Sequence, residues 1–477
     1  MENVTKETTG NSWMDSAKKI FTIPHTIALI VGLTVVAVLL THLFPAGEFN
    51  RIKDVASGKT LVDPTSYHLV KANPGQFLTI PKTLFNAMVK AADIMLFCLV
   101  VGGAFEIIMQ TNTLHAATGR AAMALRGKEA WVIPAFLSIF SVGGFTIGMS
   151  VEAVGFVPIG ILVARQLGFD VVTGVAMILL GCNIGFTAGL MNPFGVGIAQ
   201  VISQVPLFSG MGLRAALLVV LILATSLYIW RYARRVRQDP AQSVVADVAD
   251  LRTEFNESDI VVPAFEGRHL AVLIVMVAGF STLIWGVSKK DWWIPDMAAL
   301  FMVMGVLSGF VYGFGPSRVA RTFVQGAKGL VFGALVVGLA RAILLVMEDA
   351  KIIDTIVYNM ALWVGLLPPA LQLMGMYIFQ LMMSAVIVSG TGMAAVTMPI
   401  MAPLSDILGV TRQTAVLIFQ LADGFTNNIL PMSASTMSML GVAKIPYEKW
   451  MKFMWPLFGW YVLIGTIFIF IAYMIGY

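Results

Sequence analysis

Two stretches of the chain interrupt long apolar runs with clusters of polar groups that could bind an ion or a small solute. In the stretch 371–440, one apolar run ends at Ser389-Gly390-Thr391-Gly392, and a later run ends at Ala422-Asp423-Gly424-Phe425-Thr426-Asn427-Asn428. Carbonyl, hydroxyl and carboxylate oxygens suit small cations, whereas the N–H groups at a half-helix N-terminus suit a carboxylate. The chemistry indicated is reversible binding of ions and polar solutes.

The stretch 131–200 has the same arrangement. An apolar run ends at Gly148-Met149-Ser150-Val151-Glu152, and the next segment reaches Gly181-Cys182-Asn183-Ile184-Gly185-Phe186-Thr187, followed by Asn192-Pro193. The tripeptide Gly-Phe-Thr begins at 185 in one stretch and at 424 in the other. This spacing indicates an internal duplication of a broken hairpin followed by a broken helix. Broken apolar segments at matching positions in two halves are typical of a secondary transporter's binding site.

The polar groups at these interruptions are the candidate ligands. The candidate substrate ligands are Ser150, Glu152, Asn192, Ser389, Thr391, Asn427, Asn428 and Ser433. The candidate ion ligands are Gly148, Asn183, Thr187, Gly390, Asp423 and Thr426. Irregular backbone at membrane depth is tolerated only where it is buried in protein or faces water, so four interruptions at similar depth predict one shared cavity. The alternative is that they serve close helix packing, which we favour less because the pattern occurs twice.

Ionisable groups within apolar segments indicate function. Glu152 and Asp423 could each ligate a cation, accept a proton or pair with a cationic substrate. The alternative is a structural role, as a salt bridge or a helix-end carboxylate. Arg341 lies deep in another apolar segment, where it could pair with Glu106 or hold a substrate carboxylate. We favour the pair with Glu106.

The composition is that of a multi-pass membrane protein. Of the 477 residues, 58% are hydrophobic and 12% are charged, whereas a soluble domain carries about 25% charged residues. Several apolar runs reach the ~20 residues that a helix needs to cross a bilayer. The net charge of +5 is modest, so we read it as a signal for membrane orientation and expect no nucleic-acid partner.

Other function classes lack their motifs. Cys98 and Cys182 lie in apolar segments and the five histidines are scattered, so neither a disulfide framework nor a Cys/His metal site is expected. No glycine-rich stretch ends in the Gly-Lys-Ser/Thr that grips phosphate, and no nucleophile–base constellation is present. We therefore expect neither an enzyme nor an ATP-driven pump, and no cofactor apart from bound sodium.

The pattern predicts an all-α fold of about nine transmembrane helices and two re-entrant hairpins. The predicted crossings are 25–45, 85–110, 171–203, 211–230, 270–288, 294–314, 329–347, 412–440 and 453–475, the hairpins are 131–167 and 368–408, and interfacial arms occupy 112–129 and 349–366. Five crossings separate the starts of the two copies, so the second copy is inverted. Lys18 and Lys19 and the bias of Lys and Arg between loops predict a cytoplasmic N-terminus and a periplasmic C-terminus.

Several motifs resemble the YfcC family. They are Phe44-Pro45-Ala46-Gly47-Glu48-Phe49, Gly102-Gly103-Ala104-Phe105, Gly148-Met149 before an acid, Asn192-Pro193-Phe194, Gly338-Leu339-Ala340-Arg341, Ile353-Asp354-Thr355, and Ala422-Asp423-Gly424 with Asn427. That family is similar to the anaerobic C4-dicarboxylate carriers of the ion-transporter superfamily, whose relatives include AbgT proteins and divalent-anion/sodium symporters. Val151 stands where members often carry a second acid, and Pro431-Met432-Ser433-Ala434 lacks a common Thr-Ser-Gly.

The resemblance implies a homodimer in the bacterial inner membrane that works by an elevator-type movement. Hairpins and broken helices, 131–203 and 368–440, would form the transport part; 1–130 and 204–367 would form the scaffold, and 441–477 the last span. The function expected is secondary active transport of a small carboxylate-bearing metabolite, coupled to sodium or protons. An amino acid or short peptide is favoured because Glu152 and Asp423 are acidic. A C4-dicarboxylate or other organic-anion carrier and a passive channel are the alternatives.

Overall fold

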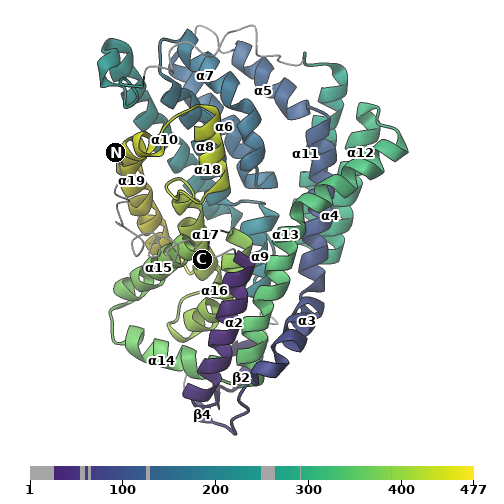
Figure 1. Ribbon diagram of the computed structural model, residues 1–477, viewed down its shortest axis with the longest axis vertical. Coiled ribbons are helices and arrows are strands. Elements are labelled where there is room, and N and C mark those ends of the chain that lie inside the picture. Colours follow the sequence, from purple (N-terminus) through teal and green to yellow (C-terminus); the bar gives the residue numbers. More distant parts are fainter. Residues whose placement is uncertain are drawn as a thin grey trace, which may run out of the picture.

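The computed structural model describes residues 26–53, 60–62, 66–124, 129–248, 264–290, 292–387 and 389–477. This part of the chain is almost entirely helical, and Figure 1 shows long helices running roughly parallel to the long axis of the molecule. The predicted all-α architecture is therefore confirmed. Lys18 and Lys19, on which part of the predicted orientation depends, lie outside the described residues.

The first copy of the repeat follows the predicted order. The second apolar span is divided at Ala91 into two helices, and an arm, a hairpin, a broken helix and a long closing helix follow. The elements are α3 (Ile80–Lys90), α4 (Ala92–Gln110), α5 (Thr113–Ala124), α6 (Glu129–Ile147), η2 (Val151–Phe156), α7 (Val157–Gln166), α8 (Val171–Ala188), η3 (Pro193–Gly197), α9 (Ile198–Ile202) and α10 (Met211–Gln238).

The second copy repeats this order, and its arm and hairpin lie at the opposite end of the molecule from those of the first copy. Its elements are α13 (Pro316–Asp349), α14 (Ile353–Gly365), α15 (Pro369–Val386), α16 (Gly390–Ile407), α17 (Arg412–Thr426), α18 (Ala434–Val442) and α19 (Tyr447–Met474). Figure 1 shows α5, α6 and α7 in the upper half and α14, α15 and α16 in the lower half. The two copies thus have the opposite orientations that the odd number of intervening crossings predicts.

The remaining elements flank the repeats. They are α2 (Thr26–Leu43), η1 (Phe77–Thr79), η4 (Pro240–Gln242), α11 (Gly267–Lys290) and α12 (Ile294–Tyr312). Four short strands form two antiparallel ribbons, β1 (Gly47–Glu48) with β4 (His68–Leu69) and β2 (Arg51–Lys53) with β3 (Thr60–Val62). Two motifs of the YfcC resemblance meet here, because Phe49 N donates to Asp354 Oδ2 (2.9 Å) and Thr355 Oγ1 donates to Pro45 O (2.8 Å).

Eight helical segments in the described part are long and apolar enough to cross a membrane. One of them is α15, an arm of the second hairpin, whereas the broken α17–α18 is not among them. The protein is thus a multi-pass membrane protein, and the exact number of crossings stays a prediction.

The core lies between the two broken helices. Every residue of α8 except Phe186 is buried, and so is every residue of α17 except Arg412. Helices α6 and α7 pack against α8, α15 and α16 pack against α17, and α10 lies against α8, α6 and α19. On the other side of the molecule, α13 packs against α3 and α4, and α12 against α4. The division into a moving part and a scaffold stays a prediction.

The helix interruptions lie later than predicted. Residues 181–187 and 422–426 are helical, and the breaks begin after Ala188 and after Thr426. Glycine and asparagine lower helix propensity by less than buried packing restores, so these residues do not end a helix whose whole circumference is covered by protein. The first break instead begins at Gly189, whose φ of 54° is left-handed, and Pro193 starts the next helical segment.

The ends of the two hairpins follow the sequence closely. Gly168 (φ 75°) follows α7 and Gly409 (φ 69°) follows α16, each one residue beyond the helix C-cap. A left-handed glycine at this position is a common helix stop. The matching Leu-Gly pairs at 167 and 408 therefore mark the same structural boundary in both copies.

Candidate functional site

A cavity of about 630 Å³, named here the tip cavity, lies between the tips of the two hairpins and the helices α4 and α13. The first hairpin contributes Ile147, Gly148, Met149, Ser150 and Val151, and the second contributes Gly390 and Thr391. The opposite wall comes from α4 and α13 and is formed by Cys98, Gly102, Phe105, Glu106, Met109, Gln325, Gly326, Gly329, Leu330 and Gly333. The shared cavity expected from the sequence is present for the hairpin tips.

The first hairpin tip lies against the break after α8. Gly148 has a left-handed φ of 64°, and a Cβ there would lie 3.0 Å from Asn192 Oδ1. Asn192 Oδ1 caps the next helical segment, accepting from Phe194 N (2.9 Å) and Gly195 N (3.3 Å). The Asn192 side-chain Nδ2 is buried and has no partner among the described residues. This donor is therefore available to a bound solute or ordered water.

The second hairpin tip lies against Asp423. A Cβ at Gly390 would overlap Asp423 Oδ2, so the tip can approach this carboxylate only as glycine. Asp423 is fully buried, and neither of its oxygens has a hydrogen-bond partner in the described part of the chain. A buried, unpaired carboxylate is costly, because charge is stable in a low-dielectric interior only with a counter-charge or a proton. Its chemistry therefore suits a small cation or a proton.

The two broken helices cross and brace one another below the tips. Asn183 Nδ2 donates to Asn428 Oδ1 (2.9 Å), and Asn428 Nδ2 in turn binds the carbonyls of Gly424 and Phe425 (both 3.1 Å). Thr187 lies directly against Gly424, where a Cβ would overlap its hydroxyl. Asn183, Asn428 and Thr187 thus hold the helices in register, and none of them lines the tip cavity.

Replacing Asn183 with Ala is expected to destabilise the protein by about 1–3 kcal/mol, because the acceptor of Asn428 is left buried without a donor. Thermal unfolding in detergent, followed by tryptophan fluorescence, measures this loss. The Asn428→Ala variant and the double variant complete a double-mutant cycle. The sum of the two single-variant losses in unfolding free energy should exceed the loss of the double variant. Additive losses would show that the amide pair contributes no coupling.

Other predicted ligands lie away from the tip cavity. Ser433 is buried before α18, with its Oγ 3.2 Å from Ser435 Oγ, and Thr426 Oγ1 is hydrogen-bonded to Ser384 Oγ (2.5 Å). The carbonyl of Asn427 accepts a hydrogen bond from Thr436 Oγ1 (2.7 Å). Asn427, Asn428 and Ser433 are therefore not among the described residues that line the tip cavity, because they lie in or directly after the second break. Their role as substrate ligands stays a prediction.

Two further predicted ligands lie at the edges of the site. Ser389 caps α16, its Oγ accepting from Gly392 N (3.3 Å) and lying 3.1 Å from Thr391 Oγ1. The backbone of Glu152 lies in η2, and its side chain is outside the described part. Ser389 thus positions the tip, and the role predicted for Glu152 stays a prediction.

Several polar residues of the site were not predicted as ligands. Gln420 reaches from α17 into the first break, where its Nε2 donates to Phe186 O (2.5 Å) and its Oε1 is buried without a partner in the described part. Arg214 Nη1 donates to Gly189 O (3.1 Å), and Trp450 Nε1 to Asn428 O (2.9 Å). These groups satisfy backbone carbonyls that the breaks expose. In the sequence, the one signal for Gln420 is that a polar residue interrupts an otherwise apolar helical segment.

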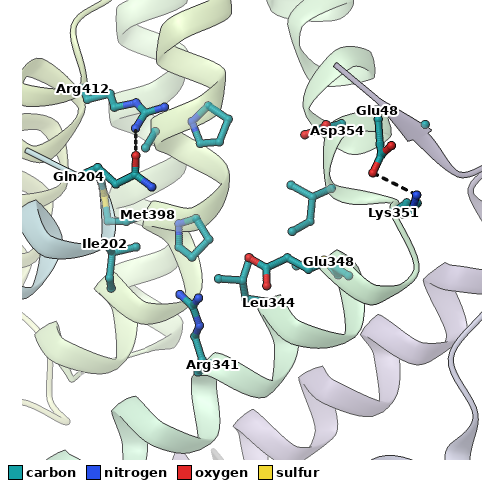
Figure 2. Close-up of a pocket in the computed structure, with 16 residues that line it drawn as sticks. Glu48, Ile202, Gln204, Arg341, Leu344, Glu348, Lys351, Asp354, Met398 and Arg412 are labelled. Carbon is teal, nitrogen blue, oxygen red and sulfur yellow. Dashed lines mark hydrogen bonds and ion pairs between the residues drawn. The ribbon is translucent and has the colours of Figure 1, made fainter. Parts of the chain in front are cut away.

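A second cavity of about 540 Å³, named here the vestibule, lies farther along α13 (Figure 2). Arg341, Leu344, Glu348 and Lys351 line it, together with Met398 and other residues of α16.

The predicted pair of Arg341 with Glu106 is wrong. Glu106 lines the tip cavity instead and accepts a hydrogen bond from Gln110 Nε2 (2.8 Å). Arg341 and Glu106 thus lie at different cavities.

An apolar barrier separates the two cavities. Gly333 lines the tip cavity and Arg341 lines the vestibule, eight residues or ~12 Å apart along α13. Between them Val336 and Ala340 are fully buried and belong to one apolar cluster with Ala395 of α16. A Cβ at Gly392 would lie 2.8 Å from Val336 Cγ1, so the second hairpin tip packs directly against this barrier.

A mainly helical membrane protein with inverted copies, two hairpin tips at one cavity and an apolar barrier beside that cavity has the features of a membrane transporter. Comparison with known proteins agrees. Residues 23–474 match the family DcuC, described as C4-dicarboxylate anaerobic carrier. The chain belongs to this family, whose members are transporters and not enzymes.

Two curated relatives are similar over nearly their whole length. The chain is 33% identical to "Putative basic amino acid antiporter YfcC" of Escherichia coli K12, with 95% of this chain and 97% of the relative covered. It is 27% identical to an uncharacterized protein of Haemophilus influenzae, with 95% of this chain and 98% of the relative covered. The YfcC resemblance seen in the sequence motifs is confirmed.

Two solved structures share the fold. The YdaH transporter of Alcanivorax borkumensis superposes with a TM-score of 0.71 at 14% identity, covering 95% of this chain and 99% of that one. MtrF of Neisseria gonorrhoeae, described with a class of antimetabolite efflux pumps, gives 0.72 at 15% identity, covering 96% and 97%. Both are AbgT-family transporters.

Proposed function

We propose that this protein is a secondary active transporter that carries an amino acid or short peptide across the bacterial inner membrane, coupled to sodium or protons. The solute binds in the tip cavity, with Ser150 and Thr391 as hydrogen-bonding partners. The proposal depends above all on the juxtaposition of Asp423 with the tip glycine Gly390, because this buried, unpaired carboxylate lies directly behind the cavity.

The electrostatics of the tip cavity favour a solute that carries both signs of charge. Glu106 is the one charged side chain among the described residues that line it, and it offers a partner for an ammonium group. At the opposite wall, the 18-residue helix α16 begins at Gly390, so its N-terminal N–H groups and partial positive charge meet the cavity. A helix N-terminus of this kind suits a carboxylate.

Asp423 supplies the coupling. A cation or proton that neutralises this carboxylate also removes repulsion from the back of the second hairpin tip, so a solute carboxylate at the N-terminus of α16 binds better once the ion is present. The tip of the hairpin links the two events because Gly390 contacts Asp423 and lines the cavity. Binding of ion and solute would then be cooperative in both directions.

The two cavities support alternating access. The tip cavity and the vestibule lie on either side of a barrier that α16 forms against α13, so movement of both hairpins along α13 would carry the solute past it. This elevator-type movement, and the homodimer in which the scaffold would be anchored, are part of the proposal.

The family description and the relative's name point to different substrates. DcuC is described as a C4-dicarboxylate carrier, whereas the E. coli relative is named for basic amino acids. A dicarboxylate would place a second negative charge near Glu106 with no fixed cation in the described lining. The lining therefore favours an amino acid, and a dicarboxylate is the second candidate.

Transport into sealed proteoliposomes tests the proposal. Labelled L-lysine, L-arginine, a dipeptide and succinate are offered under an imposed sodium gradient, an imposed proton gradient or neither, with protein-free liposomes as the control. Accumulation of a cationic or zwitterionic solute above its external concentration, under one ion gradient only, is expected. Flux that never exceeds equilibration under any ion gradient would mean a facilitator, and accumulation of succinate alone would overturn the substrate assignment.

A further inference from the structure

The vestibule carries an unusual balance of charges. Among the described residues, six charged side chains line it, and four of them have hydrogen-bond or ion-pair partners. Lys351 Nζ lies 3.3 Å from Glu48 Oε1, and Asp354 Oδ2 accepts from the backbone of Phe49 (2.9 Å). Arg412 forms a bidentate salt bridge with Asp406, from Nη2 to Oδ2 (2.7 Å) and from Nε to Oδ1 (3.0 Å). Arg341 and Glu348 are the two that remain.

Arg341 and Glu348 have no ion pair or hydrogen bond to side chains in the described part of the chain. The Nε of Arg341 is buried without a partner. Figure 2 shows the Arg341 guanidinium and the Glu348 carboxylate turned into the same open space from positions about two turns apart on α13. Two opposite charges that share a cavity and leave one another unpaired form a receptor for a molecule with the complementary pair.

We infer that the vestibule is a second solute site, which binds a zwitterionic amino compound with its carboxylate on Arg341 and its ammonium on Glu348. The planar guanidinium matches a carboxylate with two parallel hydrogen bonds, which gives Arg341 the orienting role. Glu348 is seven residues further on, on the same face of the helix and ~10.5 Å along its axis. That spacing leaves room for a solute between the side chains.

The position of this site relative to the barrier gives it a role. Arg341 directly follows Ala340 of the apolar barrier on α13, and so it is the first charge that a solute meets on leaving or approaching the barrier on this side. The vestibule site therefore loads or releases solute on the side where α13 ends. This role rests on the proposed function, whereas binding to Arg341 and Glu348 does not.

Equilibrium binding of labelled L-lysine to the purified full-length protein tests the inference without any transport step. Wild type is expected to bind two molecules per chain. Arg341→Gln and Glu348→Gln should each lower the affinity of one of the two by about tenfold or more, and Thr391→Val should weaken the other. Asp349→Asn and Arg321→Gln, both exposed charges on the same helix outside the vestibule, are the matched controls.

Single-charge probes and a charge swap sharpen the test. Butylamine and butyrate should each compete with L-lysine at the vestibule far more weakly than L-arginine does. The double variant Arg341→Glu with Glu348→Arg should recover L-lysine binding that each single reversal loses, since the solute can turn around.

The outcomes separate the two sites. Loss of one lysine in the Arg341 and Glu348 variants, with the other retained, supports the vestibule site. Unchanged stoichiometry and affinity in both variants overturns it, even where Thr391→Val shows that the tip cavity binds. If wild type binds one L-lysine and only the Arg341 and Glu348 variants lose it, the vestibule site is supported and the proposed tip-cavity site is overturned. If wild type shows no saturable binding of L-lysine, the zwitterion assignment is overturned.

Discussion

Replacing Asp423 with Asn is expected to abolish ion-driven accumulation in proteoliposomes. Asn keeps the size of the side chain and removes the negative charge that a coupling cation or proton neutralises. Because this carboxylate is fully buried beside Gly390 and has no partner in the described part of the chain, no neighbour there can take its place. Loss of one member of a buried charge pair costs several kcal/mol, so the apparent affinity for the coupling ion should fall roughly a hundredfold or more.

The measurement is uptake against ion concentration, together with the ion-dependent rise in the melting temperature of the purified protein. The Asp349→Asn variant, an exposed acid on α13, should behave as wild type in both. The Asp423→Asn protein should remain folded, since the substitution removes an unpaired buried charge. A variant that keeps the wild-type sodium and pH dependence would remove Asp423 from the coupling mechanism.

Replacing Gly424 with Ala is expected to unfold or severely destabilise the protein. A Cβ at this position would overlap Thr187 Oγ1 and lie 2.7 Å from Thr187 Cα. The obstacle is therefore backbone of a fully buried helix, which cannot turn aside as a flexible side chain can. Overpacking a close-packed core typically lowers the free energy of unfolding by up to about 3 kcal/mol. Here the added methyl group would also push apart α8 and α17, the two helices that precede the breaks.

The melting temperature and the yield of monodisperse protein measure this effect. Gly459→Ala in α19 is the matched control, because a Cβ there meets nothing within 4 Å. The control should be neutral or slightly stabilising, since Ala is the better helix former. Equal stability of the two variants would show that α8 and α17 do not cross as closely as described.

The architecture could be predicted from the sequence because its signals are strong and repeated. Long apolar runs, the duplicated Gly-Phe-Thr and the matching Leu-Gly pairs at 167 and 408 located both hairpins and both broken helices. The Leu-Gly pairs were reliable because a left-handed glycine after the last helical turn is a local requirement. Local requirements of this kind are visible in one sequence.

The interior of the site was less predictable because it depends on contacts between segments far apart in the chain. The sequence places Asn183 and Thr187 in a helix break, whereas they are helical residues that meet Asn428 and Gly424 across the core. The sequence favours a pair of Arg341 with Glu106, although the two residues line different cavities. A polar residue in an apolar helix signals that it has a partner, and the sequence does not say which.

Protection of a cysteine by solute tests whether the transported solute binds in the tip cavity. The measurement is the rate at which a membrane-impermeant thiol reagent labels Thr391→Cys, with Cys98 and Cys182 replaced by serine, in the presence and absence of a transported solute. We predict that solute and coupling ion together slow the labelling several-fold, while Leu366→Cys, on an exposed loop, reacts at an unchanged rate. A solute that is transported at full rate but leaves the labelling of Thr391→Cys unaltered would contradict the account.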